Sequence, residues 1–164
     1  IYYINLLSVG FAADVATVRA RRFSAYGQLG YFIAIFYELV RLNRRPFPLK
    51  LDGKGEFDQR PCLFLTFNNS KFTGGTMMIA PQADTNDGLI EYVRWGPISR
   101  LGLIHNLHTL YDGTHVQHPL AERHQARRID FELDSPVDVM VDGEVLTLQC
   151  ETLDVVSSAL EVVV

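Results

Sequence analysis

The sequence predicts an α+β fold that is predominantly β, a β-sandwich-like domain of many short antiparallel strands with two main α-helices. Apolar and acidic residues alternate over 129–134 and again over 137–141, as in strands with one face exposed. Asp-Gly pairs, typical of tight turns, start at positions 52, 87, 112 and 142. No repeat or low-complexity tract divides the 164 residues, so we expect one domain.

Most of the expected elements are strands, recognised by β-branched and aromatic content or by alternation. Segment 49–57 contains Asp52-Gly53 and is expected to form a hairpin. The segment 11–18 is biased towards apolar residues but is assigned no element. The expected strands cover residues 2–9, 62–67, 76–80, 89–95, 129–134, 137–141, 145–149 and 158–164.

Two segments have helical character. Residues 28–42 are apolar on nearly all sides until Glu38 and Arg41, which predicts a largely buried helix ended by the prolines that follow. This helix could line an apolar channel for a lipid, or it could only be part of the hydrophobic core. Residues 99–111 place apolar side chains on one helical face, with Ser99 as N-cap and Gly113 as the stop.

Composition excludes several classes of protein. Apolar residues make up 48% and charged residues 21%, as in folded soluble chains, and the net charge of −4 argues against a nucleic-acid partner. Two cysteines are too few for a disulfide scaffold, which favours free thiols and a cytoplasmic location. The chain begins with Ile1 rather than Met, and we expect it to be a piece of a longer protein.

Two loops contain residues suited to metal binding or to catalysis. The loop from Asp84 to Leu89 crowds oxygen-bearing side chains, the ligands that a hard cation such as Mg²⁺ prefers. The turn Asp142-Gly143-Glu144 fixes a carboxylate at a sheet edge, where it could act as a general base. Asp142 competes with Glu144 for that role. Five histidines lie between positions 105 and 124, but no matching Cys or carboxylate spacing completes a zinc site.

Short motifs along the chain occur in a familiar order. They are Gly10-Phe11-Ala12-Ala13-Asp14-Val15, Phe67-Asn68-Asn69, Gly74-Gly75, Ala80-Pro81-Gln82-Ala83, Asp87-Gly88-Leu89, Gly113-Thr114-His115 and Val141-Asp142-Gly143-Glu144. This series resembles the diacylglycerol kinase catalytic-domain family, which includes bacterial soluble lipid kinases and the sphingosine and ceramide kinases. The resemblance covers essentially the whole chain.

The resemblance implies that residues 1–164 are the lipid-binding C-terminal domain of a two-domain lipid kinase. In that family an N-terminal domain with a Gly-Gly-Asp-Gly-Thr loop binds ATP, and this chain has no such loop. We therefore expect ATP to bind mainly to that other domain and the fragment alone to be inactive. The implied partners are a lipid substrate, ATP, the protein's own N-terminal domain and, transiently, a membrane surface.

The resemblance also implies roles for individual residues. Glu144 corresponds to the proton acceptor for the lipid hydroxyl, and Asp142, Gly143 and Glu144 face the nucleotide. Mg²⁺ is implied at the Asp87 carboxylate and at the carbonyls of Asp84 and Leu89. The lipid pocket is expected between the two helices, with its polar end near Asp14 and His115. Its apolar lining is expected to come from Tyr31, Phe32, Ile35, Leu103 and Leu107.

One departure bears on the substrate. Sphingosine kinases carry a second acid two residues after the position of Asp14, and here that residue is Ala16, which favours a diacylglycerol-type lipid over sphingosine. Two alternatives stay open: a relative of the NAD kinases that acts on a soluble substrate, and a non-catalytic β-sandwich interaction domain. The presence of both Glu144 and the Asp87 loop argues against the second.

Overall fold

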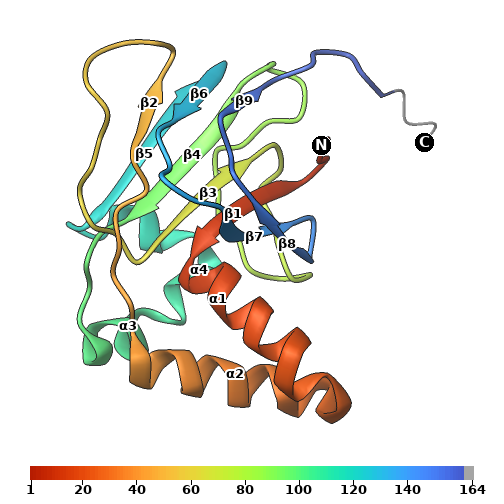
Figure 1. Ribbon diagram of the computed structural model, residues 1–164, viewed down its shortest axis with the longest axis vertical. Coiled ribbons are helices and arrows are strands. Elements are labelled where there is room, and N and C mark those ends of the chain that lie inside the picture. The colour runs from red at the N-terminus through yellow and green to blue at the C-terminus, as the bar shows by residue number, and fades with distance from the viewer. Residues whose placement is uncertain (161–164) are drawn as a thin grey trace.

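The computed structural model describes residues 1–160 of the chain. Two antiparallel sheets pack on each other, and helices cover one end of the molecule (Figure 1). The large sheet has the strand order β5-β4-β3-β1-β7-β8, and the small sheet has the order β2-β6-β9. The architecture confirms the expected α+β, predominantly β, sandwich-like fold.

The large sheet contains β1 (Leu6–Gly10), β3 (Phe64–Asn68), β4 (Ile90–Trp95), β5 (Ala121–Ala126), β7 (Val137–Val141) and β8 (Glu144–Leu148). The small sheet contains β2 (Leu49–Leu51), β6 (Arg128–Phe131) and β9 (Thr152–Asp154). The helices are α1 (Phe11–Val18), α2 (Gly27–Arg41), α3 (Arg100–Asn106) and α4 (Thr109–Asp112). A π-helical turn, η1 (Arg19–Phe23), and a 3-10 turn, η2 (Ser24–Tyr26), join α1 to α2, and the 3-10 turn η3 (Thr114–Gln117) follows α4.

Side-chain alternation gives the large sheet two apolar faces and therefore two core clusters. Leu7 and Val9 of β1 face the small sheet, where they join Phe67, Ile129 and Val139. Leu6 of β1 faces the other way and joins a cluster with Phe64, Val93, Trp95 and Leu103, which includes residues of α2, α3 and α4. The large sheet is thus buried on both faces near its centre.

A glycine directs the chain from β1 into α1. Gly10 has φ +83°, and a Cβ atom there would lie 2.5 Å from the carbonyl oxygen of Leu63. Only glycine fits this close approach without strain. The helix therefore starts directly at the end of the central strand, where the backbone N–H of Phe11 donates to the same carbonyl at 2.9 Å. This turn brings Asp14 to the helical end of the molecule.

Several expected elements differ from the structure. Residues 76–80 form no strand, because Gly74 and Gly75 both have positive φ and the chain loops back through an isolated bridge between Thr73 and Met77. One edge strand of the large sheet is β5, which was not expected because its polar sequence AERHQA has no strand-like alternation. The segment 11–18, which was assigned no element, is α1.

Two expected strands at the C-terminal end also need correction. The strands expected at 129–134 and 137–141 exist as β6 and β7, but they belong to different sheets. The strand expected at 158–164 is wrong for its first residues, because Ser157 and Ser158 form a turn. Its residues 161–164 lie outside the described part of the chain. The last described strand is β9.

The two expected helices are present with different details. α2 is not largely buried, because a face containing Leu29, Phe32, Phe36 and Val40 is exposed. The second helix is split into α3 and α4. Its ends are as expected: the Ser99 side chain accepts from Gly102 N–H, and Gly113 adopts the left-handed conformation after α4.

Candidate functional site

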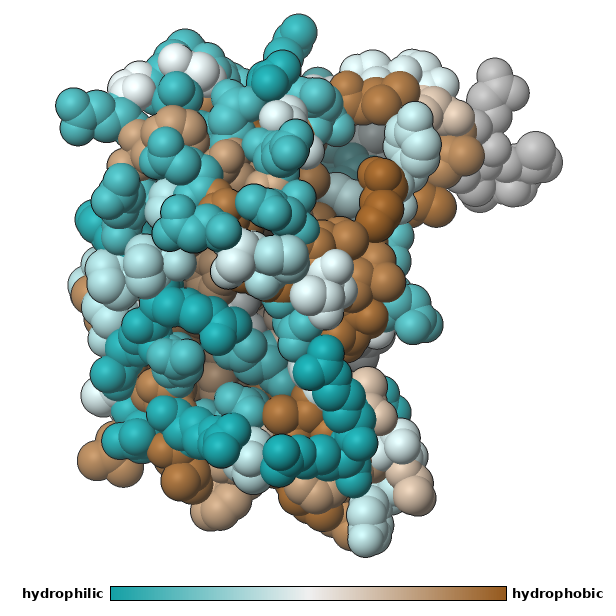
Figure 2. Space-filling model, in the orientation of Figure 1, coloured by the Kyte–Doolittle hydropathy of each residue, from teal (hydrophilic) through white to brown (hydrophobic). Residues whose placement is uncertain are grey.

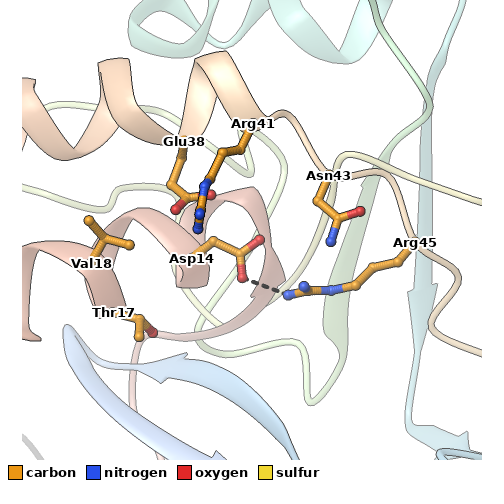
Figure 3. Close-up of a pocket in the computed structure, with 7 residues that line it drawn as sticks. All are labelled: Asp14, Thr17, Val18, Glu38, Arg41, Asn43 and Arg45. Carbon is orange, nitrogen blue, oxygen red and sulfur yellow. Dashed lines mark hydrogen bonds and ion pairs between the residues drawn. The ribbon is translucent and has the colours of Figure 1, made fainter.

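A polar pocket lies between α1 and α2, with a volume of about 440 Å³ (Figure 3). It lies at the helical end of the molecule, beside the second half of α1 and the C-terminal end of α2. Its lining consists of Asp14, Thr17 and Val18 from α1, Glu38 and Arg41 from α2, and Asn43 and Arg45 from the segment that follows. Because α1 begins at the end of β1 and α2 packs back on α1, the fold itself creates this pocket.

Asp14 and Arg45 form an ion pair on one side of the pocket, with 2.6 Å between Asp14 Oδ1 and an Arg45 guanidinium nitrogen (Figure 3). Burial raises the pKa of Asp14, while the charge and hydrogen bond of Arg45 act to lower it. The Arg45 guanidinium also lies over the Phe47 ring, 5.3 Å from its centre. The Arg45 guanidinium is therefore held in place by Asp14 and by the Phe47 ring.

Glu38 faces this pair from α2. Its side chain is 7% exposed, and no hydrogen bond or ion pair joins its carboxyl group to another residue in the described part of the chain. Burial raises the pKa of Glu38, and the neighbouring negative charge of Asp14 raises it further. A buried acid with a perturbed pKa in the wall of a pocket is a feature typical of functional sites.

Glu144 lies elsewhere, at the start of β8, and its side chain is exposed. The β7–β8 hairpin turns through Asp142 and Gly143, both with positive φ. The Asp142 carboxylate accepts hydrogen bonds from three backbone N–H groups, those of Ile4 at 2.7 Å and of Asn5 and Leu6 at 2.9 Å each. Asp142 therefore anchors the hairpin to the N-terminal segment, and Glu144 extends from this anchored turn.

Asp14 and Glu144 are not brought together within this chain. Leu7 pairs with Val141 near the hairpin turn, whereas Asp14 follows the other end of β1 at Gly10, roughly 10 Å of strand away at 3.3 Å per residue. Glu144 is also the direct cross-strand partner of Val141, whose side chain joins the core against the small sheet. α1 packs on the opposite side of β7, where Asp138 pairs with Arg21.

The loop expected to bind magnesium is a series of tight turns. Oδ1 of Asp84 accepts from Asn86 N–H at 2.9 Å, and Oδ1 of Asp87 accepts from Leu89 N–H at 2.8 Å. Oδ2 of Asp87 lies 3.5 Å from Gln125 Nε2, so one carboxylate oxygen has only a long contact. Among the residues described, no group of three or more His, Cys, Asp or Glu side chains is placed to hold a metal ion. Carbonyl oxygens and water would have to complete a cation site here.

The residues expected to line a lipid channel are divided between two environments. Leu103 is fully buried and Leu107 packs against the same core cluster. Tyr31 and Phe32 lie on the exposed part of α2, and Ile35 is half-buried. The two helices meet where Arg100 of α3 donates to carbonyl oxygens near the end of α2, at 3.2 and 2.8 Å.

His115 occupies the core on the helix side of the sheet. It is 1% exposed, and its ring nitrogens lie 3.0 Å from the Ile79 carbonyl oxygen and 3.2 Å from that of Thr109. Burial lowers its pKa, and the two carbonyls oppose that effect. The ring therefore joins the loop before β4 to α4, and the structure does not bring His115 into the pocket that holds Asp14.

A second cavity of about 330 Å³ lies beside β2 and β5. Three of the charged groups there pair with one another, because Arg60 contacts both Asp58 and Glu122 at 2.7 Å. Because these groups are satisfied internally, the cavity between α1 and α2 is the stronger candidate site.

Sequence reasoning did not single out Glu38 or Arg45. A signal for Glu38 was present, since it is the one acidic residue in the long apolar stretch of α2. Arg45 carried no signal, because its partner Asp14 is thirty-one positions away and the contact depends on how α2 packs on α1.

Residues 5–164 match the family described as the YegS C-terminal NAD kinase beta sandwich-like domain, and the chain belongs to this family. Two curated relatives are similar in sequence. A "Diacylglycerol kinase" of Mycobacterium tuberculosis is 29% identical over 161 residues, which is 98% of this chain and 52% of the relative. A "Probable lipid kinase YegS-like" of Pectobacterium atrosepticum is 25% identical over 163 residues, which is 97% of this chain and 52% of the relative.

A solved structure with a similar fold is a "putative diacylglycerol kinase" from Bacillus anthracis. The TM-score is 0.64 at 16% sequence identity, and the match covers 93% of this chain and 50% of that chain. The chain thus spans about half the length of the curated relatives and of this structure. The match confirms the fold.

Proposed function

We propose that residues 1–164 form the substrate-binding, C-terminal half of an ATP-dependent lipid kinase. Membership of the family over residues 5–164 carries this proposal, together with curated relatives that are named diacylglycerol kinase and lipid kinase. An N-terminal nucleotide-binding domain would supply the ATP site. Ala16, where sphingosine kinases have an acid, favours a diacylglycerol-type alcohol over an amine-bearing lipid.

Glu144 is the proposed catalytic base. The lipid hydroxyl oxygen would form a bond to the γ-phosphorus of ATP as the bond to the β–γ bridging oxygen breaks, and ADP would leave. The hydroxyl proton would pass to the Glu144 carboxylate. Exposure of Glu144 on an anchored hairpin supports this role, because the carboxylate is free to face a nucleotide bound by another domain.

Asp84, Asp87 and Leu89 are the residues that would hold Mg²⁺. The loop offers the kind of donor that this ion prefers, since Asp87 retains a carboxylate oxygen with only a long contact and the other donors are backbone carbonyls. When bound, the ion would rigidify the turn that leads into β4.

The test is steady-state kinetics of the complete protein with ATP and a short-chain diacylglycerol. Glu144→Gln should lower kcat by roughly 10²- to 10⁴-fold while KM for the lipid changes little, because the amide keeps the shape of the side chain but accepts no proton. Glu151→Gln is the matched control, since Glu151 is also an exposed glutamate near a strand end.

Two results would contradict parts of this proposal. Near-normal turnover of Glu144→Gln, with loss of activity in a folded Asp142→Asn protein, would assign the base to Asp142. Absence of phosphoryl transfer to any lipid alcohol by the wild-type protein would reject the lipid kinase function itself.

A further inference from the structure

The cavity of about 330 Å³ beside β2 and β5 contains a buried hydroxyl group without a partner. Tyr92 of β4 lines this cavity and is only 2% exposed. Its hydroxyl has no hydrogen-bond partner among the residues described, yet it is not one of the unpaired side-chain oxygens that the fold seals from solvent. The hydroxyl therefore faces the open space of the cavity, where a ligand can reach it.

Tyr92 is also the middle ring of an aromatic ladder across the large sheet. Phe67 of β3 and His124 of β5 are its direct cross-strand neighbours. The centre of the Tyr92 ring lies 5.6 Å from that of Phe67 and 5.9 Å from that of His124, with angles of 24° and 21° between the ring planes. Because β5 is an edge strand and His124 is exposed, no further strand of the described chain supplies a fourth ring to the ladder.

The charges around the cavity are balanced and favour neither an anion nor a cation. Arg60 pairs with both Asp58 and Glu122 at 2.7 Å. The buried guanidinium of Arg94 lies 3.8 and 3.5 Å from the same two acids. The remaining charged residues of the lining are two lysines and two acids, Lys50, Lys54, Asp52 and Glu56. An anion would meet the acids and a cation would meet the basic residues, so an uncharged ligand fits best.

The open end of the aromatic ladder favours a planar ligand. Heteroaromatic bases stack on aromatic side chains, including histidine, and this stacking tolerates different ring systems. The side chain of Tyr92 is longer than that of His124, so its hydroxyl can donate to or accept from the polar edge of a ring that rests against the imidazole. The cavity volume of about 330 Å³ falls within the range of small-molecule sites.

We propose that this cavity binds an uncharged heteroaromatic ring, such as a nucleobase, which stacks on His124 and forms a hydrogen bond with the Tyr92 hydroxyl. The ring belongs either to a free nucleoside or to a nucleotide. The site lies at the edge of the large sheet opposite to the one that carries Glu144. The proposal goes beyond kinase activity and does not depend on it, because it concerns binding alone.

The test is a titration of the complete protein, labelled with ¹³C in its histidine and tyrosine rings and followed by NMR through the signals of His124 and Tyr92. The probes are adenosine, which carries an uncharged heteroaromatic base, and ribose, which has the sugar hydroxyls without the base. Adenosine should shift both signals in a saturable manner, with a dissociation constant of roughly 0.1–10 mM for a ligand of this size. Ribose should bind at least about tenfold more weakly, because it cannot stack.

Adenosine 5′-monophosphate distinguishes the two sources of the base. Tighter binding than adenosine assigns the cavity to a nucleotide, and equal or weaker binding assigns it to a free nucleoside. Both results support the shared chemistry.

Two variants test the residues, and in each the signal of the other residue reports binding. His124→Ala removes the stacking platform and should weaken adenosine binding at least about fivefold. Tyr92→Phe removes only the hydroxyl oxygen and should weaken binding roughly three- to tenfold. It should not lower Tm, because the hydroxyl has no partner within the described chain. His105→Ala and Tyr111→Phe, at exposed positions of α3 and α4, are the matched controls and should leave binding unchanged.

The proposal is overturned if ribose binds as tightly as adenosine, or if adenosine produces no saturable shift of these two rings, in which case water alone satisfies the Tyr92 hydroxyl. It is also overturned if either His124→Ala or Tyr92→Phe retains the affinity of the wild type. Failure of the lipid kinase assay would leave the binding result unaffected, so the two proposals can fail separately.

Discussion

At the scale of single residues, the Asp-Gly turns perform a second task besides turning the chain. Asp52 and Asp142 both have positive φ and both precede a glycine. Oδ1 of Asp52 accepts from the backbone N–H groups of Arg127 and Arg128, just as Asp142 accepts from the N-terminal segment. Each aspartate thus fastens its turn to a distant part of the backbone.

We predict that Asp142→Gly lowers the free energy of unfolding by about 2 kcal/mol. Glycine retains the positive φ, while the loss leaves three backbone N–H groups without their charged acceptor. Urea denaturation measures the effect, and Asp134→Gly is the control, because Asp134 is an exposed loop aspartate without a side-chain hydrogen bond to any other described residue. Equal stability of the two variants would show that the hydrogen bonds of Asp142 contribute nothing.

At the scale of elements, α2 has two different sides. One side packs on α1 and carries Glu38, whereas the opposite side exposes Phe32 and Phe36, each 67% accessible. The apolar surface is visible at the lower end of the molecule, where α2 lies (Figure 2). Exposed arginines of the preceding π-helical turn, Arg21 and Arg22, lie close to this helix in the chain. No helix among the described residues is long and apolar enough to cross a membrane.

We predict that this face of α2 contacts membranes peripherally. The double variant Phe32→Ser and Phe36→Ser in the complete protein should lower co-sedimentation with phosphatidylglycerol vesicles at least about tenfold, since burial of each Phe contributes roughly 1.5–3 kcal/mol. Binding to phosphatidylcholine vesicles should be weaker, because the arginines find no anionic headgroups.

A control for this experiment is Val156→Ser, which alters an apolar residue that is 59% exposed and lies in the segment after β9. It should leave vesicle binding unchanged. Unaltered co-sedimentation of the Phe32 and Phe36 variant would remove α2 from the membrane contact.

At the scale of the whole molecule, two sets of acids contribute to stability with opposite dependence on pH. The pKa values of Asp14 and Glu38 are raised, chiefly by burial. Their contribution to stability is present below their unfolded pKa values and is lost as pH rises through the folded values. The pKa values of Asp58 and Glu122 are lowered, chiefly by hydrogen bonds from Arg60. Their contribution is present above the unfolded values and is lost as pH falls through the folded ones.

Replacing one acid of each set by its isosteric amide should change stability with opposite pH trends. The stability of Glu38→Gln relative to the wild type should increase as pH rises from about 4 to about 8, because the wild type alone must ionise a buried acid. Glu122→Gln should be less stable than the wild type near neutral pH, and this deficit should shrink in acid. Chemical denaturation at a series of pH values measures both differences, and the same pH trend for both variants would refute the assignment.

The sequence by itself determined the class of the fold and most of its local turns. Alternation located β6 and β7, the pair Asp142-Gly143 marked the β7–β8 hairpin, and the caps Ser99 and Gly113 marked the ends of a helical segment. The order of the short motifs pointed to the family. These features depend on neighbours in the chain, and local backbone preferences therefore reveal them.

Only the tertiary structure decided which residues meet. The edge strand β5 has no alternating pattern, because pairing with β4 rather than its own side chains fixes it in the sheet. The apolar character of α2 could not show that one face lacks a covering partner. The pocket of Asp14, Glu38 and Arg45 arises because Gly10 turns the chain sharply into α1 and α2 folds back on it, and the same packing places Glu144 at the opposite end of β1. Contacts between residues distant in the chain depend on this packing, and no local pattern in the sequence records it.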